Sequence, residues 1–322
     1  MRTRFTDLVG CSLPLQLAGM PEISTPALAA AVASAGGLGM IGAPLLSPDE
    51  MAARTADLAQ RTAGAPGTFG VNFLMPFLDR DCVAVAARTA RVVEFFYGEP
   101  ERALVDTVHA GGALASWQVG SLDEARAAVA AGCDIVVAQG TEAGGHVRGR
   151  IGVLPLLSAV VDAVPVPVLA AGGIATARGV AAALAAGAAG VRVGTRFVAA
   201  AESGAHPAYV DALLRATGED TVLTEAFSVS WPNAPHRVLR SCVAAAGALQ
   251  QDVVGEVERG GHQLPLPRFS PMVPTAQTRG AVEAMALYAG EGVGAVVRVQ
   301  PAEEIVRELM EGAARLLAAE RP

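Results

Sequence analysis

Leu169–Phe197 reads LAAGGIATARGVAAALAAGAAGVRVGTRF, an order of residue types typical of a strand, a helix and a second strand. Apolar residues precede a Gly-Gly pair, an alanine-rich stretch follows, and GVRV (Gly190–Val193) leads into Gly-Thr. Strands separated by a helix pair in parallel through right-handed crossovers. The stretch therefore predicts one unit of an α/β protein with a glycine turn after each strand.

The same alternation runs through the first two hundred residues, where eight short apolar runs are each followed by a helical stretch. Eight β/α units predict a closed (β/α)8 TIM barrel within residues 1–201. An open, doubly wound sheet is the alternative, although no GxGxxG follows the first run. The eight runs are Pro14–Ala18, Leu38–Ile41, Phe69–Leu74, Val92–Phe96, Ala113–Val119, Asp134–Ala138, Val166–Ala171 and Gly190–Val193.

The pattern changes in residues 202–322, which we expect to form a mostly helical C-terminal lobe packed on the barrel. His206–Thr217 has a helical pattern, and Thr221–Phe227 is a candidate for one more strand. From His236 onward we expect mainly helix, broken by the proline-rich segment Leu264–Pro274. This tail is too long for a single closing helix, so the fold class is α/β with a helical extension.

The composition excludes several functional classes. All 24 basic residues are arginine and the net charge is −7, so neither nucleic-acid binding, Schiff-base chemistry nor a lysine-bearing P-loop is expected. Apolar runs are interrupted before they could span a bilayer, and the first residues contain no long apolar region. We therefore expect a cytoplasmic protein with no membrane partner. The cysteines have no CxxC spacing, so we predict reduced thiols and no metal site; they are Cys11, Cys82, Cys133 and Cys242.

Two glycine turns predict a phosphate site. AAGGIAT (Ala170–Thr176) and VGTRF (Val193–Phe197) each place glycine between a strand and the start of a helix. Glycine allows the backbone to approach a ligand closely, and a helix N-terminus offers unpaired N–H groups. The last two strands of such barrels often bind phosphate in this way. Ordinary glycine-containing βα turns are the alternative interpretation.

Thr141–Arg150, TEAGGHVRGR, is a polar and flexible segment in an otherwise apolar chain. Its histidine, His146, has an ordinary pKa near neutrality and so can accept or donate a proton. Arg148 and Arg150 could attract an anionic substrate, although a solvated charge is the simpler interpretation. On position alone, His146 is equally well explained as a catalytic base or as a solvated loop residue.

QGTEAGGHVRG, together with the Leu169–Phe197 stretch, resembles the nitronate monooxygenase family, formerly called 2-nitropropane dioxygenases. The flavin-dependent enoyl-acyl-carrier-protein reductases of the same fold are relatives of this family. The resemblance extends over most of the chain, through LQLAGM, STPALAAAVASAGGLGMIGA, FGVNFL and AGEGVGAVVRVQPAEEIVREL.

The resemblance implies a barrel that holds non-covalent FMN and carries a catalytic histidine at His146. It implies that Gly172, Gly173, Gly194 and Thr195 hold the FMN phosphate. The positions that it places beside the rest of the flavin are Gly19, Met20, Asn72, Gln118, Gln139 and Gly144.

The implied activity is the oxidation of alkyl nitronates with dioxygen to carbonyl compounds and nitrite. The alternative is an NAD(P)H-dependent reduction of an enoyl thioester or another activated double bond. A barrel that binds a phosphate compound without redox work is a third possibility. A nucleotide dehydrogenase is disfavoured, because Cys133 precedes its strand and Cys242 lies in the tail. Trp231 is a candidate for shaping the pocket, and a homodimer is possible.

Overall fold

The computed structural model describes residues 1–43, 45–259 and 262–319. Eight parallel strands close into a barrel in the order β1-β2-β3-β4-β5-β6-β8-β9, and β9 pairs with β1. The TIM barrel predicted from the sequence is therefore confirmed, and each of its strands overlaps one predicted run. These strands are β1 (Leu15–Leu17), β2 (Leu38–Gly42), β3 (Thr68–Leu74), β4 (Val92–Phe96), β5 (Leu114–Val119), β6 (Ile135–Gln139), β8 (Val168–Ala171) and β9 (Gly190–Val193).

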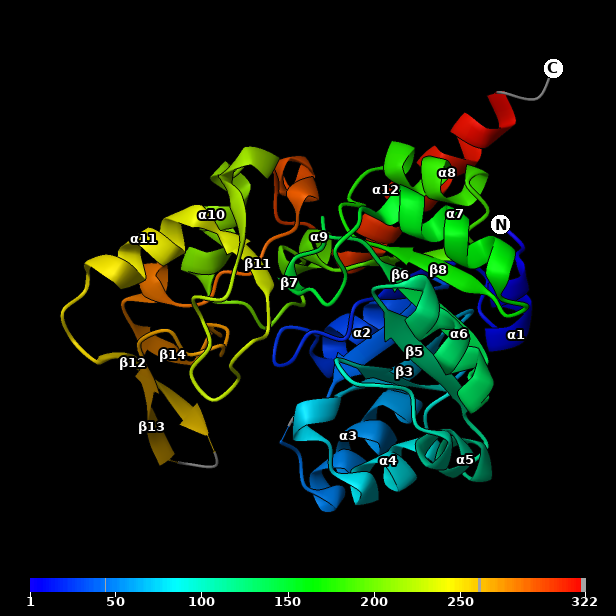
Figure 1. Ribbon diagram of the computed structural model, residues 1–322, viewed down its shortest axis with the longest axis horizontal. Helices are drawn as coiled ribbons and strands as arrows, with labels where there is room; N and C mark the ends of the chain where they lie inside the picture. Colours follow the sequence, from blue (N-terminus) through cyan, green and yellow to red (C-terminus); the bar gives the residue numbers. More distant parts are fainter. Residues whose placement is uncertain (44, 260–261, 320–322) are drawn as a thin grey trace.

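Helices surround the barrel, as Figure 1 shows. Several begin where a serine, threonine or aspartate side chain accepts a backbone N–H of the first turn, as Thr25 and Thr176 do. Between consecutive strands lie α2 (Pro26–Ser34), α3 (Pro48–Arg61), η1 (Met75–Phe77), α4 (Arg80–Ala87), α5 (Arg102–Ala110), α6 (Leu122–Ala131), α7 (Val153–Ala163) and α8 (Ala177–Ala185). A short helix, α1 (Arg4–Val9), precedes β1 and buries Phe5 in the barrel core.

The outer ring is completed by a helix from the far end of the chain. The helix after β9, α9 (Thr195–Val198), has only four residues. α12 (Ala302–Ala319) packs instead against α8 and α2, and its buried face joins the barrel core. The buried Arg196 side chain of α9 is paired with Glu308 of α12 at 2.9 Å.

The chain between α9 and α12 forms a lobe with a second hydrophobic core. It contains α10 (Pro207–Arg215), η2 (Gly218–Asp220), β10 (Thr221–Thr224), β11 (His236–Leu239), α11 (Arg240–Ala248), β12 (Val253–Arg259), β13 (His262–Pro267), β14 (Thr278–Gly280), η3 (Val282–Ala284) and η4 (Glu291–Ala295). The lobe stands beside the barrel in Figure 1. The expected helical extension is present as α10, α11 and α12.

Two expectations for this segment need correction. The chain after His236 is not mostly helical before α12, because β11 to β14 lie there. β12 and β13 form an antiparallel hairpin, and β14 pairs with the other edge of β12. The last helix also belongs to the barrel core rather than to the lobe, since its apolar face fills the gap left by the short α9. Within the described residues, no helix is long and apolar enough to cross a membrane.

Candidate active site

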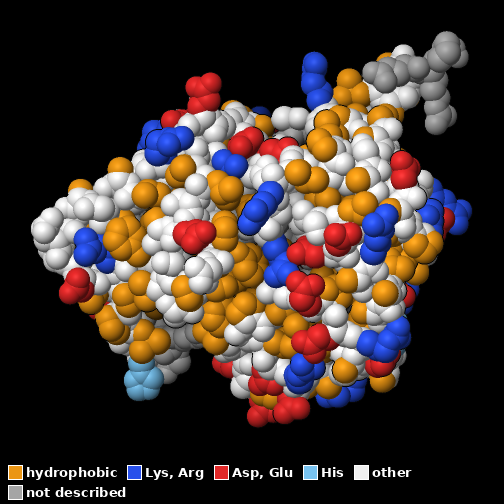
Figure 2. Space-filling view, viewed as in Figure 1, with side chains coloured by type: hydrophobic (Ala, Val, Ile, Leu, Met, Phe, Trp, Pro, Cys, Tyr) orange, Lys and Arg blue, Asp and Glu red, His pale blue; other side chains and the backbone are white. Residues whose placement is uncertain are grey.

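A cavity of about 730 Å³ lies at the carboxyl ends of the barrel strands and is roofed by the lobe. Figure 2 shows hydrophobic side chains gathered in the hollow between the two parts. This is where active sites of TIM barrels lie. Every residue that the sequence singled out for the flavin or for catalysis lines it, namely Gly19, Met20, Asn72, Gln118, Gln139, Gly144, His146, Gly172, Gly173, Gly194 and Thr195.

Two glycine turns give one end of the cavity a row of backbone donors. Gly172 and Gly173 have left-handed φ values of 114° and 66°, which other residues rarely adopt. Within the described residues, the backbone N–H groups of Gly172, Gly173 and Gly194 find no hydrogen-bond acceptor. Such a group of N–H donors binds anions, phosphate above all.

The lobe closes tightly over this end through Gly290. Its N–H donates to Thr195 Oγ1 at 3.0 Å. A Cβ added to Gly144 would lie only 2.4 Å from the Gly290 nitrogen, so the loop after β6 and the lobe are in backbone contact. Glycine at position 144 is therefore required by packing, in addition to any contact it makes with a ligand.

Amide side chains also line the cavity. Gln118 and Asn72 come from β5 and β3 and reach the cavity from the barrel interior. Gln139, the last residue of β6, donates its Nε2 to the carbonyl of His146 at 3.0 Å. Its Oε1 is buried and has no partner among the described residues.

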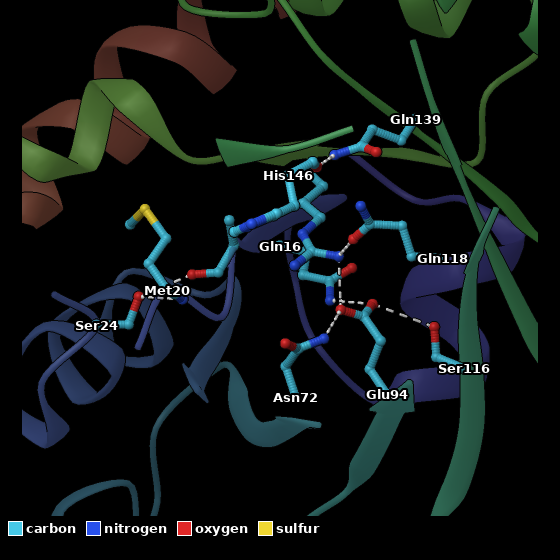
Figure 3. Close-up of polar contacts among 11 residues, drawn as sticks. Gln16, Met20, Ser24, Asn72, Glu94, Ser116, Gln118, Gln139 and His146 are labelled. Atoms are coloured by element: carbon cyan, nitrogen blue, oxygen red, sulfur yellow. Dashed lines mark hydrogen bonds and ion pairs between the residues drawn. The ribbon is translucent and has the colours of Figure 1, made fainter. Parts of the chain in front are cut away.

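A buried ion pair lies beneath these amides. Glu94 of β4 and Arg192 of β9 are joined at 2.6 Å between Oε1 and Nη1. Figure 3 shows Gln16, Asn72 and Ser116 converging on the same carboxylate. A charge in a barrel interior is costly unless it is paired and hydrogen-bonded, and this carboxylate is both.

His146 is fixed at the mouth of the cavity by a short strand, β7 (Gly145–His146), that pairs with β11 of the lobe. Its ring stacks on Trp231 at a centroid distance of 3.8 Å. Tyr97 and Tyr288 flank it with centroids 5.7 and 5.6 Å away. The Nε2 atom is buried and has no partner among the described residues. The sequence left His146 open between a solvated and a functional residue, and the burial of Nε2 in the cavity lining disfavours a solvated residue.

Burial, and then the nearby His236, lower the pKa of His146 to about 3. His236 lies 5.2 Å away between ring centroids, and burial lowers its pKa as well. His236 is fully engaged, since its Nδ1 faces the carbonyl of Ala234 at 2.8 Å and its Nε2 accepts the N–H of Phe227. His146 is thus a neutral imidazole whose buried Nε2 has no partner among the described residues.

Two other charged residues of Thr141–Arg150, Glu142 and Arg148, have structural partners. Glu142 accepts the N–H of Val153 and so caps α7. Arg148 pairs with Glu124 at 2.5 Å and also with Glu99, and it does not line the cavity. Arg150 also lies outside the lining. Arg148 is thereby accounted for by its ion pairs, which disfavours a role in attracting substrate.

Some lining residues had not been singled out from the sequence. Gly290 and Gly292 come from AGEGVG, whose three closely spaced glycines were a usable signal. Tyr288 precedes that motif, and Arg192 sits inside the GVRV strand. A charged residue in an otherwise apolar barrel strand was the signal for Arg192. Among the described residues, no group of three His, Cys, Asp or Glu side chains is placed to hold a metal ion.

A family model described as nitronate monooxygenase matches residues 2–84 and 77–312 of this sequence. The chain belongs to the nitronate monooxygenase family. It is therefore an oxidoreductase.

The proteins that this chain resembles have names that indicate different activities. A carboxyl-CoA dehydrogenase of Mycobacterium tuberculosis, acting on a 5-hydroxy-7a-methyl-1-oxo-octahydroindene skeleton, is 36% identical over 75% of this chain and 67% of its own. FabK from Thermotoga maritima superposes with a TM-score of 0.81 and 31% identity, covering 99% of this chain and 98% of its own. A nitroalkane oxidase from Streptomyces ansochromogenes superposes with a TM-score of 0.79 and is 31% identical, covering 99% of this chain and 100% of its own.

Proposed function

We propose that this member of the nitronate monooxygenase family binds FMN and oxidises alkyl nitronates with dioxygen, giving carbonyl compounds and nitrite. The observation that carries the proposal is the free Nε2 of His146, buried at the cavity mouth and held neutral. The similarity to a nitroalkane oxidase over the full length supports the same substrate class.

The lining of the cavity suits both the phosphate and the ring of FMN. The free N–H groups of Gly172, Gly173 and Gly194 suit a phosphate, and the positive φ of the first two keeps side chains out of the way. The unpartnered Oε1 of Gln139 suits an N–H donor of a flat, polar ring. A volume near 730 Å³ holds a ligand of this size and leaves space for a small substrate.

His146 acts on the proton of the substrate. A neutral nitroalkane must lose the proton on the carbon beside the nitro group before it becomes a nitronate. A neutral imidazole can accept that proton. The lowered pKa keeps the ring neutral but also makes it a weak base, so the transfer depends on the anionic nitronate staying beside the new positive charge. The bound flavin supplies the redox chemistry. Trp231 and the β7–β11 pairing hold the ring in place.

A reductase is the second candidate. The sequence also resembles the flavin-dependent enoyl-acyl-carrier-protein reductases, and FabK matches this chain as well as the nitroalkane oxidase does. In that case NAD(P)H is the electron donor, and His146 orients an activated double bond or relays a proton to it. The tight stack with Trp231 is equally compatible with a substrate-orienting role.

Anaerobic reduction of the bound flavin distinguishes the oxidation of nitronates from an NAD(P)H-dependent reduction. Purified protein showing flavin absorbance is mixed separately with propionate 3-nitronate, NADH and NADPH, and the flavin band is followed. We expect bleaching by the nitronate. Bleaching by a nicotinamide alone would move the assignment to the reductase, and a protein that takes up no FMN would exclude both.

A further inference from the structure

The Glu94–Arg192 pair is oriented, with its positive end toward the cavity. Arg192 lines the cavity, whereas Glu94 is 0% exposed and lies below it. Glu94 accepts hydrogen bonds from Gln16 and Asn72, each at 2.9 Å. The carboxylate is therefore satisfied from within the barrel and anchors the guanidinium from behind.

Some N–H groups of the Arg192 guanidinium have no hydrogen-bond acceptor within the described part of the protein. Its Nη1 serves both Glu94 and Gln118 Oε1. Its remaining N–H groups have no acceptor among the described residues, and its side chain is 9% exposed, on the cavity side. A guanidinium carries five donors in a rigid fork, so several are available to an acceptor in the cavity.

This arrangement is unusual for a structural pair. Burying both charges in a barrel is expensive and is often matched or bettered by apolar side chains. Among the described residues, Arg196 also has an unpartnered Nη1, but that atom is enclosed by protein and Arg196 does not line the cavity, whereas Arg192 does. The free donors and the oriented charge point instead to a ligand that becomes negative.

We propose that Arg192, anchored by Glu94, raises the reduction potential of the flavin by stabilising its reduced, anionic form. The inference rests on the FMN binding proposed above. FMN that accepts two electrons and one proton gains one net negative charge on its ring. A positive charge at the cavity floor acts in a poorly screened interior, where charge–charge attraction is strong. It therefore favours reduced over oxidised FMN.

The midpoint potential of the bound flavin tests this, measured by dye equilibration on FMN-loaded protein. Replacing Arg192 with Gln (Arg192→Gln) removes the charge and keeps a polar side chain. We expect at least a tenfold loss in the preference for reduced over oxidised FMN, which equals about 30 mV for a two-electron couple. Arg192→Lys retains the charge and should restore most of the potential. Glu94→Gln leaves the cation uncompensated and should raise the potential.

Arg196→Gln is the matched control. This arginine is equally buried, but its partners are Gln300 and Glu308 of the α12 region and it does not line the cavity. We expect a lower melting temperature and an unchanged potential. If the role of Arg192 were merely structural, Arg192→Gln would likewise lower the melting temperature and leave the potential unchanged.

A folded, FMN-loaded Arg192→Gln protein with the wild-type potential would overturn the inference and leave the proposed function standing. If that variant does not fold, Glu94→Gln decides, since an unraised potential there also overturns it. Wild-type protein without flavin absorbance would exclude the proposed function and this inference together.

Discussion

At the scale of single residues, the decisive feature is a histidine whose pKa is lowered far below its ordinary value. Burial, and then the nearby His236, hold the His146 ring neutral. A neutral imidazole held in this way takes up a proton from a bound substrate and not from the solvent. Two measurements follow from that state.

Replacing His146 with Asn should separate the two substrate forms. Neutral nitroalkane needs a base, so we expect kcat/KM to fall by about 100- to 10,000-fold. A preformed nitronate has already lost its proton, so its kcat/KM should change by less than about tenfold. Oxygen consumption with each form gives both values. His109→Asn, which removes an exposed histidine paired with Asp134, is the matched control and should leave both unchanged. Equal losses on the two forms would contradict the role of base.

Stability should also fall in mild acid because of His146. The native state protonates this ring only near pH 3, whereas the unfolded chain protonates it near pH 6.5. The unfolded state therefore binds more protons between these values, and stability drops as pH falls through that window. At roughly 1.4 kcal/mol per pH unit, wild type should lose about 2 kcal/mol more than His146→Asn between pH 6.5 and 5. Urea unfolding at both pH values measures the difference, and parallel losses would refute it.

Much of the site could be predicted at this scale, for a physical reason. Gly172 and Gly194 stand directly after strands, Gln139 is the last residue of one, and the strand ends of a barrel share one rim. Arg192 and Trp231 were harder to assign. The partner of Arg192 is 98 positions away in sequence on another strand, and the stack of Trp231 on His146 depends on a loop of the lobe. Contacts of that kind have no local signature.

At the scale of elements, the turn after β8 carries the expected phosphate contact. Gly172→Ala places a side chain where φ is 114°, at about 1–3 kcal/mol of strain, and near the carbonyl of Gly140. We expect FMN affinity to fall at least tenfold, which fluorescence quenching of added FMN would show.

Gly64→Ala provides the comparison for that turn. Gly64 has a similar positive φ of 76°, and an added Cβ would meet nothing within 4 Å. It does not line the cavity. The substitution should cost similar stability and leave FMN affinity as it is. Equal loss of affinity in both variants would argue that strain, and not the phosphate contact, is responsible.

Elements were predictable where the apolar pattern is long and regular. All eight barrel strands overlap predicted runs because each is a nearly continuous apolar segment. β7 has only two residues and exists through its pairing with β11, so no local pattern marks it. β13 reads HQLPLP and is exposed apart from Leu266, and its two prolines make the segment resemble a break between helices.

At the scale of the whole molecule, the cavity joins two hydrophobic cores. Its lining comes from the barrel and from lobe residues such as Gly290 and Tyr288. A ligand in it should therefore stabilise both parts together. FMN at 100 times its Kd should add about 2.7 kcal/mol to the free energy of unfolding. Removal of FMN should lower the melting temperature accordingly.

Riboflavin is the control for this stabilisation, because it lacks the phosphate that the glycine turns are expected to bind. At the same concentration it should raise the melting temperature by much less than FMN. Calorimetry or fluorescence-monitored melting gives both shifts. Equal shifts would mean that the turns at Gly172 and Gly194 do not bind phosphate.

The place of α12 in the outer ring has a consequence for synthesis on the ribosome. The groove between α2 and α8 is filled by a helix made only after the whole lobe, so the barrel emerges with one apolar side uncovered. At about 5–20 residues per second, the roughly hundred intervening residues leave that side open for about 5–20 s. During that interval the nascent chain should be a substrate for chaperones. Pulse proteolysis of ribosome-bound chains ending before and after α12 would test it, and equal protection of the two would rule the delay out.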